Sequence, residues 1–256
     1  MRQRVRALAR LGHTLLHVLH GTAIVLLCFP RLDQAARHER IRWFAAKLLR
    51  VLGVQRVVDG VLHAGPTLLA ANHVSWLDIA AIHSVCPHAR FVSKADVQGW
   101  PVICRLIDSA GTLYIERGRK RDALRVGHLM AQALQRGETV PVFPEGTIGD
   151  GHTLLPFHAN LLQAAIAVGS PVQPAVLRYS DGTHAVSPAA AYVGKTTLLQ
   201  SVWRIACAER LTVRLRLLPP VGTRHAERRA LAQRLQEEIG SGLPAADSLD
   251  GARNAC

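Results

Sequence analysis

The chain has 256 residues and 49% of them are hydrophobic, so it can bury a sizeable core and is too apolar to be disordered. Its 31 Lys and Arg outnumber its 18 Asp and Glu, which gives a formal net charge of +13. This charge indicates an anionic partner and excludes none of three kinds: nucleic acid, phospholipid headgroups and phosphorylated or acidic substrates.

A long uncharged stretch follows a basic N-terminus. Residues 1–10 carry four Arg, and residues 11–30 contain no Asp, Glu, Lys or Arg. Twenty helical residues extend about 30 Å, roughly the thickness of the hydrocarbon core of a bilayer. His13, His17 and His20 fall on one face of such a helix. A polar stripe on an apolar helix suits an element that lies in the plane of the membrane interface.

The next segment, residues 32–52, has the same character. It carries one apolar stripe, and its cations lie off that stripe. The stripe consists of Ile41, Phe44, Ala45, Leu48 and Leu52, and the cations are Arg42, Lys47 and Arg50. Residues 1–53 are therefore expected to form an amphipathic helical hairpin that dips into one leaflet, at the cytoplasmic face of the membrane. The alternative is a soluble hairpin packed on the rest of the protein.

From residue 54 onward, short apolar strands alternate with helices. Strands are expected at 55–62, 67–71, 89–93, 112–116, 139–143, 172–179 and 211–217. Helices are expected at 77–85, 101–109, 120–135, 159–168, 196–208 and 225–239. This alternation predicts an α/β fold, a mostly parallel sheet with helices on both faces. Residues 54–242 are taken as one domain, and the small, polar residues 243–256 as a disordered tail.

Residues 71–78 (Ala-Asn-His-Val-Ser-Trp-Leu-Asp) follow an apolar strand and open a helix. Ligands of open α/β sheets bind at such strand ends. If His73 lies in the turn and Asp78 in the first helical turn, the carboxylate can hold one imidazole nitrogen. The other nitrogen is then free to remove a proton from a hydroxyl. The alternative is a helix cap, in which Asp78 binds backbone N–H groups and His73 is only a turn residue.

Three further segments contain candidate binding residues. Residues 111–118 form a short strand that ends at Arg117, whose guanidinium can bind a phosphate bidentately. Residues 142–147 are an apolar strand that ends in a turn with Glu145, Gly146 and Thr147, which could meet the hydroxyls or phosphate of an acceptor. Residues 170–176 are an apolar strand with two prolines. Each segment alone could be an ordinary turn or strand end.

Together, in this order and spacing, these four segments resemble the glycerolipid acyltransferase family. The resemblance runs from about residue 69 to residue 179. The motif N-H-x-x-x-x-D is matched by Asn72, His73 and Asp78, and G-x-x-[FY]-I-x-R by Gly111, Tyr114, Ile115 and Arg117. The motif F-P-E-G-T is matched by Phe143, Pro144, Glu145, Gly146 and Thr147, and the proline-flanked strand by Pro171 and Pro174.

The resemblance implies an O-acyltransferase that makes phosphatidic acid from 1-acylglycerol-3-phosphate (lysophosphatidic acid). His73 and Asp78 would be catalytic, and Arg117, Glu145, Gly146 and Thr147 would bind the acceptor. The partners would be the lysophospholipid, membrane lipids, and acyl-CoA or acyl-carrier protein as the acyl donor. No cofactor and no metal is expected, because five scattered Cys lack any C-x-x-C pair and the His residues lack metal spacing.

One departure from the family pattern affects the acceptor. The family usually continues the third motif with Arg-Ser, whereas this chain continues with residues Ile148, Gly149, Asp150 and Gly151. In lacking this Arg, the chain resembles family members that acylate lyso-ornithine lipid, an acceptor that has no phosphate. Lys94 is a candidate replacement cation. Two alternatives of another class are an inactive membrane-binding protein and a basic nucleic-acid-binding protein, although no nucleic-acid-binding motif is present.

Overall fold

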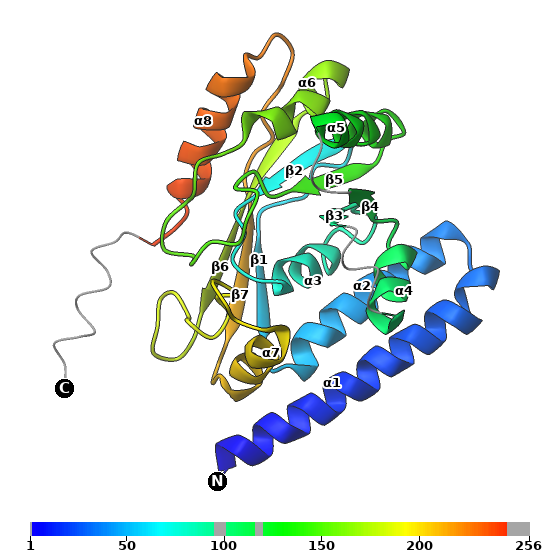
Figure 1. The fold of residues 1–256 in the computed structure, drawn as a ribbon, viewed down its shortest axis with the longest axis vertical. Helices are drawn as coiled ribbons and strands as arrows, with labels where there is room; N and C mark the ends of the chain where they lie inside the picture. The colour runs from blue at the N-terminus through cyan, green and yellow to red at the C-terminus, as the bar shows by residue number, and fades with distance from the viewer. Residues whose placement is uncertain (1, 95–100, 116–119, 245–256) are drawn as a thin grey trace, which may run out of the picture.

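The computed structural model describes residues 2–94, 101–115 and 120–244. It consists of a sheet with helices on both faces, and an N-terminal helical hairpin lies along one side (Figure 1). The predicted α/β fold with a mostly parallel sheet is therefore confirmed. The expected tail lies almost entirely outside the described residues.

The hairpin consists of helices α1 (Arg2–Leu27) and α2 (Gln34–Val51), joined by a short 3-10 turn (Phe29–Arg31). Asp33 caps α2, because its carboxylate accepts a hydrogen bond of 2.8 Å from the backbone N–H of Ala36. The segment Arg2–Arg31 is long and apolar enough to cross a membrane, and only 11% of its most apolar window is buried. Such low burial is unlike that of a core helix of a soluble protein.

The histidine face of α1 packs against α2. The His17 ring stacks on Phe44 at 4.5 Å between centroids, and its Nε2 lies 3.0 Å from the carbonyl oxygen of Phe44. The His20 ring meets the edge of Trp43 at 5.5 Å. The expectation of an exposed polar stripe was therefore wrong for His17, which is buried, whereas His13 and His20 are exposed. The exposed surface of α1 also carries a row of apolar side chains, which consists of Val5, Leu8, Leu15, Leu16, Leu19, Leu26 and Leu27.

The main sheet has the strand order β1-β7-β6-β2-β5. Its strands are β1 (Gln55–Asp59), β2 (Thr67–Ala71), β5 (Thr139–Val142), β6 (Val172–Ser180) and β7 (Thr212–Leu217). Only the β6–β7 pair is antiparallel among the described strands. Because β2, β5 and β6 are parallel neighbours, their carboxyl ends meet at one edge of the sheet.

Two short strands stand apart from the main sheet. Strands β3 (Val92–Lys94) and β4 (Leu113–Ile115) pair with each other in parallel. The sequence placed them in a single sheet with the others. Among the described residues, one isolated bridge, between Ala89 and Thr139, links the start of the strand expected at 89–93 to β5.

The helices of the domain cover the two faces of the sheet in two groups. They are α3 (Leu77–His83), α4 (Pro101–Ser109), α5 (Lys120–Gln135), α6 (Gln163–Val168), which follows a 3-10 turn (Ala159–Leu162), α7 (Leu198–Cys207) and α8 (Arg228–Gly240). Helices α2, α3 and α7 contribute to one hydrophobic cluster and α5, α6 and α8 to the other. In β2, Leu69 belongs to the first cluster and Leu68 to the second, which explains why this strand has no polar face.

His83, in the last turn of α3, makes the stability of the fold depend on pH. Burial lowers the pKa of His83 from 6.5 to about 4. Between these two values the unfolded chain binds the proton and the folded chain does not, so stability falls as the pH drops from about 6.5 to 4. The full effect amounts to about 3 kcal/mol.

We therefore expect the stability gap between wild type and His83→Gln to shrink by up to about 3 kcal/mol from pH 7 to pH 4. Urea unfolding at a series of pH values measures this gap. His152→Gln, at an exposed position, is the matched control and should leave the gap constant. A gap for His83→Gln that does not change with pH would contradict the prediction.

Candidate active site

The carboxyl end of β2 is tied to the neighbouring strand β6 by one side-chain amide. The Asn72 side chain donates to the carbonyl oxygen of Leu177 at 2.8 Å and accepts from its backbone N–H at 2.7 Å. Asn72 is buried. Pro174, in the same strand, lies opposite Ala70 of β2, just before the residues of β6 that pair with β7. Together these contacts fix where β2 ends and the following turn begins.

His73 and Asp78 form a hydrogen-bonded pair. Nδ1 of His73 lies 2.7 Å from Oδ2 of Asp78. An ionised carboxylate can only accept, so Nδ1 carries the proton and donates. Nε2 makes no hydrogen bond to any residue that the structure describes, and the His73 side chain is 16% exposed. The ring also stacks on Phe143 with 3.9 Å between centroids and 9° between planes, which fixes its orientation.

The Asp78 carboxylate has two roles at once. Its Oδ2 accepts from His73 and also from the backbone N–H groups of Val74 at 2.8 Å and Ser75 at 3.0 Å. Its Oδ1 accepts from the hydroxyl of Tyr179 at 2.7 Å. Asp78 therefore caps the turn before α3 and also orients His73, so one carboxylate makes both sets of hydrogen bonds.

Tyr179 was not among the candidate residues found from the sequence. It lies in β6 and is completely buried. Burial and the charge of Asp78 raise the pKa of Tyr179, so its hydroxyl stays protonated and acts as a donor. A tyrosine in a central strand must find a partner for its hydroxyl, and that requirement was the available signal.

Glu145, which follows β5, accepts a hydrogen bond from the turn that contains His73. Its Oε1 accepts from the backbone N–H of His73 at 2.8 Å, and its Oε2 accepts from that of Leu155 at 2.9 Å. Burial raises the pKa of Glu145, and these two backbone donors oppose the rise. The side chain thus links two loops to β5. Its predicted contact with an acceptor stays a prediction.

The turn after Glu145 contacts the segment that contains His73. Gly146 has a φ of +68°, and a Cβ there would lie 2.9 Å from the His158 ring. Gly146 and Thr147 are exposed. The backbone N–H of Gly149 donates to the carbonyl oxygen of His73 at 2.7 Å. The Asp150 carboxylate accepts from the backbone N–H of His152, so this part of the departure from the family pattern is a local turn.

The second motif lies partly outside the described residues. Gly111 precedes β4 with a φ of +71°, and its carbonyl oxygen accepts from Arg90 at 2.8 Å. Arg117 lies outside the described residues. Lys94 ends β3 and lies opposite Ile115 of β4. Since the two strands are parallel, Lys94 and the chain that leads to Arg117 lie at the same end of this pair.

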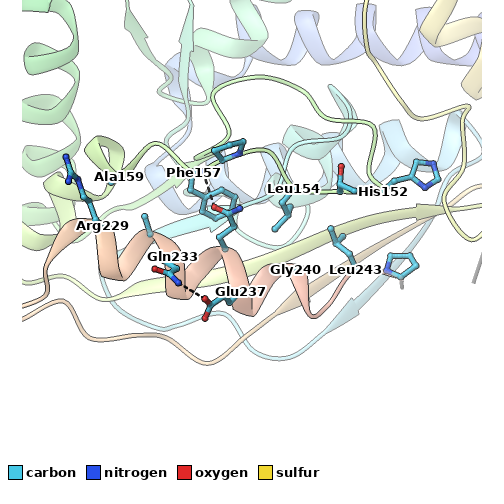
Figure 2. A pocket seen from close by; sticks show the side chains of 14 residues that line it. His152, Leu154, Phe157, Ala159, Arg229, Gln233, Glu237, Gly240 and Leu243 are labelled. Carbon is cyan, nitrogen blue, oxygen red and sulfur yellow. Dashed lines mark hydrogen bonds between the residues drawn. The ribbon is translucent and has the colours of Figure 1, made fainter. Parts of the chain in front are cut away.

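A cavity of about 620 Å³ lies between α8 and residues 152–159 (Figure 2). Its wall combines apolar side chains, such as Leu154 and Phe157, with Arg229 and the hydrogen-bonded pair Gln233 and Glu237. Neither His73 nor Asp78 lines it. The hydrogen-bonded pair of His73 and Asp78 therefore lies outside this cavity.

Comparison with known proteins decides the family. A family model described as acyltransferase matches residues 50–178, which include the N-H-x-x-x-x-D and F-P-E-G-T motifs. The chain belongs to the acyltransferase family. Relatives of known name agree with this membership. The chain is 35% identical over 212 residues to a lyso-ornithine lipid O-acyltransferase of Pseudomonas aeruginosa, covering 82% of this chain and 81% of that protein.

Two further relatives bear on the type of acyltransferase and on the fold. A 1-acyl-sn-glycerol-3-phosphate acyltransferase of Neisseria meningitidis is 39% identical over 180 residues, 69% of each chain. The crystal structure of the 1-acyl-sn-glycerophosphate (LPA) acyltransferase PlsC from Thermotoga maritima superposes with a TM-score of 0.65. The superposition covers 91% of this chain and 95% of the Thermotoga maritima chain at 23% sequence identity, so this similarity shows the fold alone. The chain is therefore an O-acyltransferase of this family, and its relatives carry names with two different acceptors.

Asp78→Asn separates the charge of this side chain from its capping role. An Asn keeps an oxygen for the N–H groups of Val74 and Ser75, and its amide can donate to Tyr179. It removes the negative charge that stabilises a protonated His73. We expect kcat of the acyltransferase to fall roughly 10²–10⁴-fold while the melting temperature changes little. Near-wild-type turnover in a steady-state assay would mean that Asp78 is only a cap.

Tyr179→Phe tests the donor behind Asp78. Loss of a hydrogen bond to a buried carboxylate costs about 1.5–3 kcal/mol, and part of it should appear in catalysis. We expect kcat to fall about tenfold or more with little change in KM.

The matched control for Tyr179→Phe is Tyr192→Phe. The Tyr192 hydroxyl makes no hydrogen bond to the residues that the structure describes, although its backbone N–H donates to Val74. This control should leave kcat unchanged. Equal effects of the two substitutions would show that the Tyr179 hydroxyl plays no particular role.

Proposed function

We propose that this acyltransferase moves a fatty acyl group to the sn-2 hydroxyl of 1-acylglycerol-3-phosphate and so produces phosphatidic acid. The observation that carries the proposal is the state of the His73 ring. Nδ1 is held by a buried carboxylate at 2.7 Å, and Nε2 makes no hydrogen bond to a described residue. A histidine in this state is prepared to act as a general base toward a hydroxyl.

The reaction needs no intermediate bound to the enzyme. Nε2 of His73 takes the proton from the acceptor hydroxyl, and the oxygen forms a bond to the thioester carbonyl carbon. The carbon–sulfur bond then breaks, and the protonated His73 returns its proton to the thiolate. Asp78 stabilises the imidazolium between these two steps. Such proton transfer accounts for roughly 10²–10⁴ in rate, and positioning on the membrane contributes the rest.

The phosphate of the acceptor would be bound by cations at the end of the β3–β4 pair. Lys94 ends β3, and Arg117 follows β4 by two residues. Arg binds phosphate bidentately and Lys adds a second positive charge. Glu145, Gly146 and Thr147 would border the glycerol backbone, since they follow β5 beside His73.

A lyso-ornithine lipid is the second candidate acceptor. Two observations favour it: the relative of that name in Pseudomonas aeruginosa aligns with 82% of this chain, and Ile148 stands where an Arg is usual. Its acceptor hydroxyl would be attacked by the same chemistry at His73. The two acceptors differ in the headgroup, so the choice depends on Lys94 and Arg117 rather than on the catalytic pair.

The acyl donor would be acyl-CoA or acyl-carrier protein, and no cofactor takes part, because each step above is a proton transfer or a carbonyl substitution. Both donors are made inside the cell, which favours the cytoplasmic face of the membrane. The hairpin of α1 and α2 would bring the domain to that face, where the acceptor and product reside.

One assay tests the acceptor. Purified full-length protein in phospholipid vesicles receives either lysophosphatidic acid or lyso-ornithine lipid, each with acyl-CoA or acyl-carrier protein, and the lipid products are identified. We expect phosphatidic acid as the main product, and none with His73→Ala. Lys94→Ala and Arg117→Ala should each raise the KM for lysophosphatidic acid by roughly tenfold, since a charged contact is lost.

The outcomes are distinct. Acylation of lyso-ornithine lipid alone would reject the phosphate acceptor and keep the chemistry. Activity in His73→Ala would reject the mechanism itself. Acylation of neither lipid, by protein whose circular dichroism shows a folded state, would reject both acceptors.

A further inference from the structure

The outer face of α7 carries large apolar side chains in contact with solvent. Leu199 is 83% exposed and Trp203 is 39% exposed, and they lie one helical turn apart on the same face. Val193, in the turn before the helix, is 38% exposed. We call Leu199 and Trp203 the α7 patch. Exposed apolar side chains that cluster in this way mark contact surfaces.

The α7 patch adjoins the membrane-contacting helix. The guanidinium of Arg10 in α1 donates to the carbonyl oxygens of Ala206 at 2.9 Å and Ala208 at 2.8 Å, at the end of α7. The Gln3 side chain donates to the carbonyl oxygen of Cys207 at 3.2 Å. Position 207 lies four residues after Trp203 and so shares its face of the helix. Figure 1 shows α7 beside the N-terminal half of α1.

The charges around the α7 patch favour an anionic surface. Residues 2–31 and 193–207 together contain seven Lys and Arg and no Asp or Glu. Two of the cations, Lys195 and Arg204, are exposed and border the patch. Apolar side chains with an adjacent Trp and a rim of cations are typical of surfaces that lie at the boundary between headgroups and acyl chains.

We propose that the α7 patch is a second membrane-contacting surface, which inserts Leu199 and Trp203 into the boundary of an anionic bilayer beside α1. Its occupant is the lipid surface that α1 already contacts, because the two surfaces are joined through Arg10 and Gln3 and carry the same charge. The inference holds for either acceptor.

The α7 patch is also linked to the catalytic turn. The buried hydroxyl of Ser201 in α7 accepts from Nε1 of Trp76 at 3.1 Å, and Trp76 lies two residues before Asp78. Ile79, the residue after Asp78, is 40% exposed. A bilayer against α7 would thus be held close to the turn that carries His73. This arrangement would place the general base near the depth at which a lysolipid presents its headgroup hydroxyl.

The test uses full-length protein and vesicles of phosphatidylglycerol and phosphatidylcholine, with binding measured by sedimentation. The double variant Leu199→Ser and Trp203→Ser should bind roughly tenfold more weakly, because two apolar side chains no longer enter the bilayer. The matched control is Val61→Ser with Leu124→Ser. These two side chains are 84% and 77% exposed and lie outside α1 and α7, so the control should bind as wild type does.

A second measurement does not depend on a destabilising variant. Vesicles whose acyl chains carry bromine quench a tryptophan that reaches the acyl region. The chain has four Trp, so the quenching of wild type minus that of Trp203→Phe reports on Trp203. We expect Trp203 to be quenched on vesicle binding.

Each result supports or overturns the inference. Binding by the double variant equal to that of the control, or the absence of Trp203 quenching, would overturn it. A wild-type dimer that the double variant abolishes would assign the patch to a second copy of the chain. A raised KM for acyl-carrier protein with unchanged vesicle binding would assign it to the donor. Vesicle binding requires no turnover, so this test is independent of whether the proposed acceptor is correct.

Discussion

A single buried carboxylate determines the arrangement of the active site. Asp78 has no exposed surface, and an unpaired charge at such a place would cost several kcal/mol. Four donors offset that cost: His73, the backbone of Val74 and Ser75, and the Tyr179 hydroxyl. These four contacts define the geometry of the turn, in which Nε2 of His73 makes no hydrogen bond to a residue that the structure describes. The hydrogen bonds that stabilise the buried Asp78 carboxylate thus also orient the His73 ring.

The order of strands makes this interaction available. Strand β2 lies between β6, which supplies Tyr179, and β5, which leads to Glu145. Three parallel strands therefore place Tyr179, His73 and Glu145 at one edge of the sheet. Strand β7 lies on the other side of β6 and contributes no side chain to the hydrogen bonds of Asp78 described above. Asp78 and His73, which follow β2, are therefore held by Tyr179 of β6 and by Glu145, which follows β5.

Much of this could be predicted from the sequence, for identifiable reasons. The strand 67–71 is apolar at four of its five positions because both of its faces are buried, and its end marked the position of His73. The spacing to Asp78 fits a turn followed by a first helical turn, and the structure has that geometry. Tyr179 lies 101 residues from Asp78, and their contact depends on strand order, which no local pattern contains. The same holds for the separate β3–β4 pair and for the packing of His17 on Phe44.

The turn that carries His73 is attached on two sides to the elements proposed to contact the membrane. Helix α3, which carries Asp78, packs against α2 of the hairpin, and Trp76 bonds to Ser201 of α7. With these elements on a bilayer, packing rather than a flexible linker would set the height of His73 above it. This matters because the acceptor is confined to the interface, so a base at the wrong depth would never meet the hydroxyl, however well oriented its ring. The charge of +13 fits the same proposal, since cations in segments without acidic residues would hold the protein against anionic lipid.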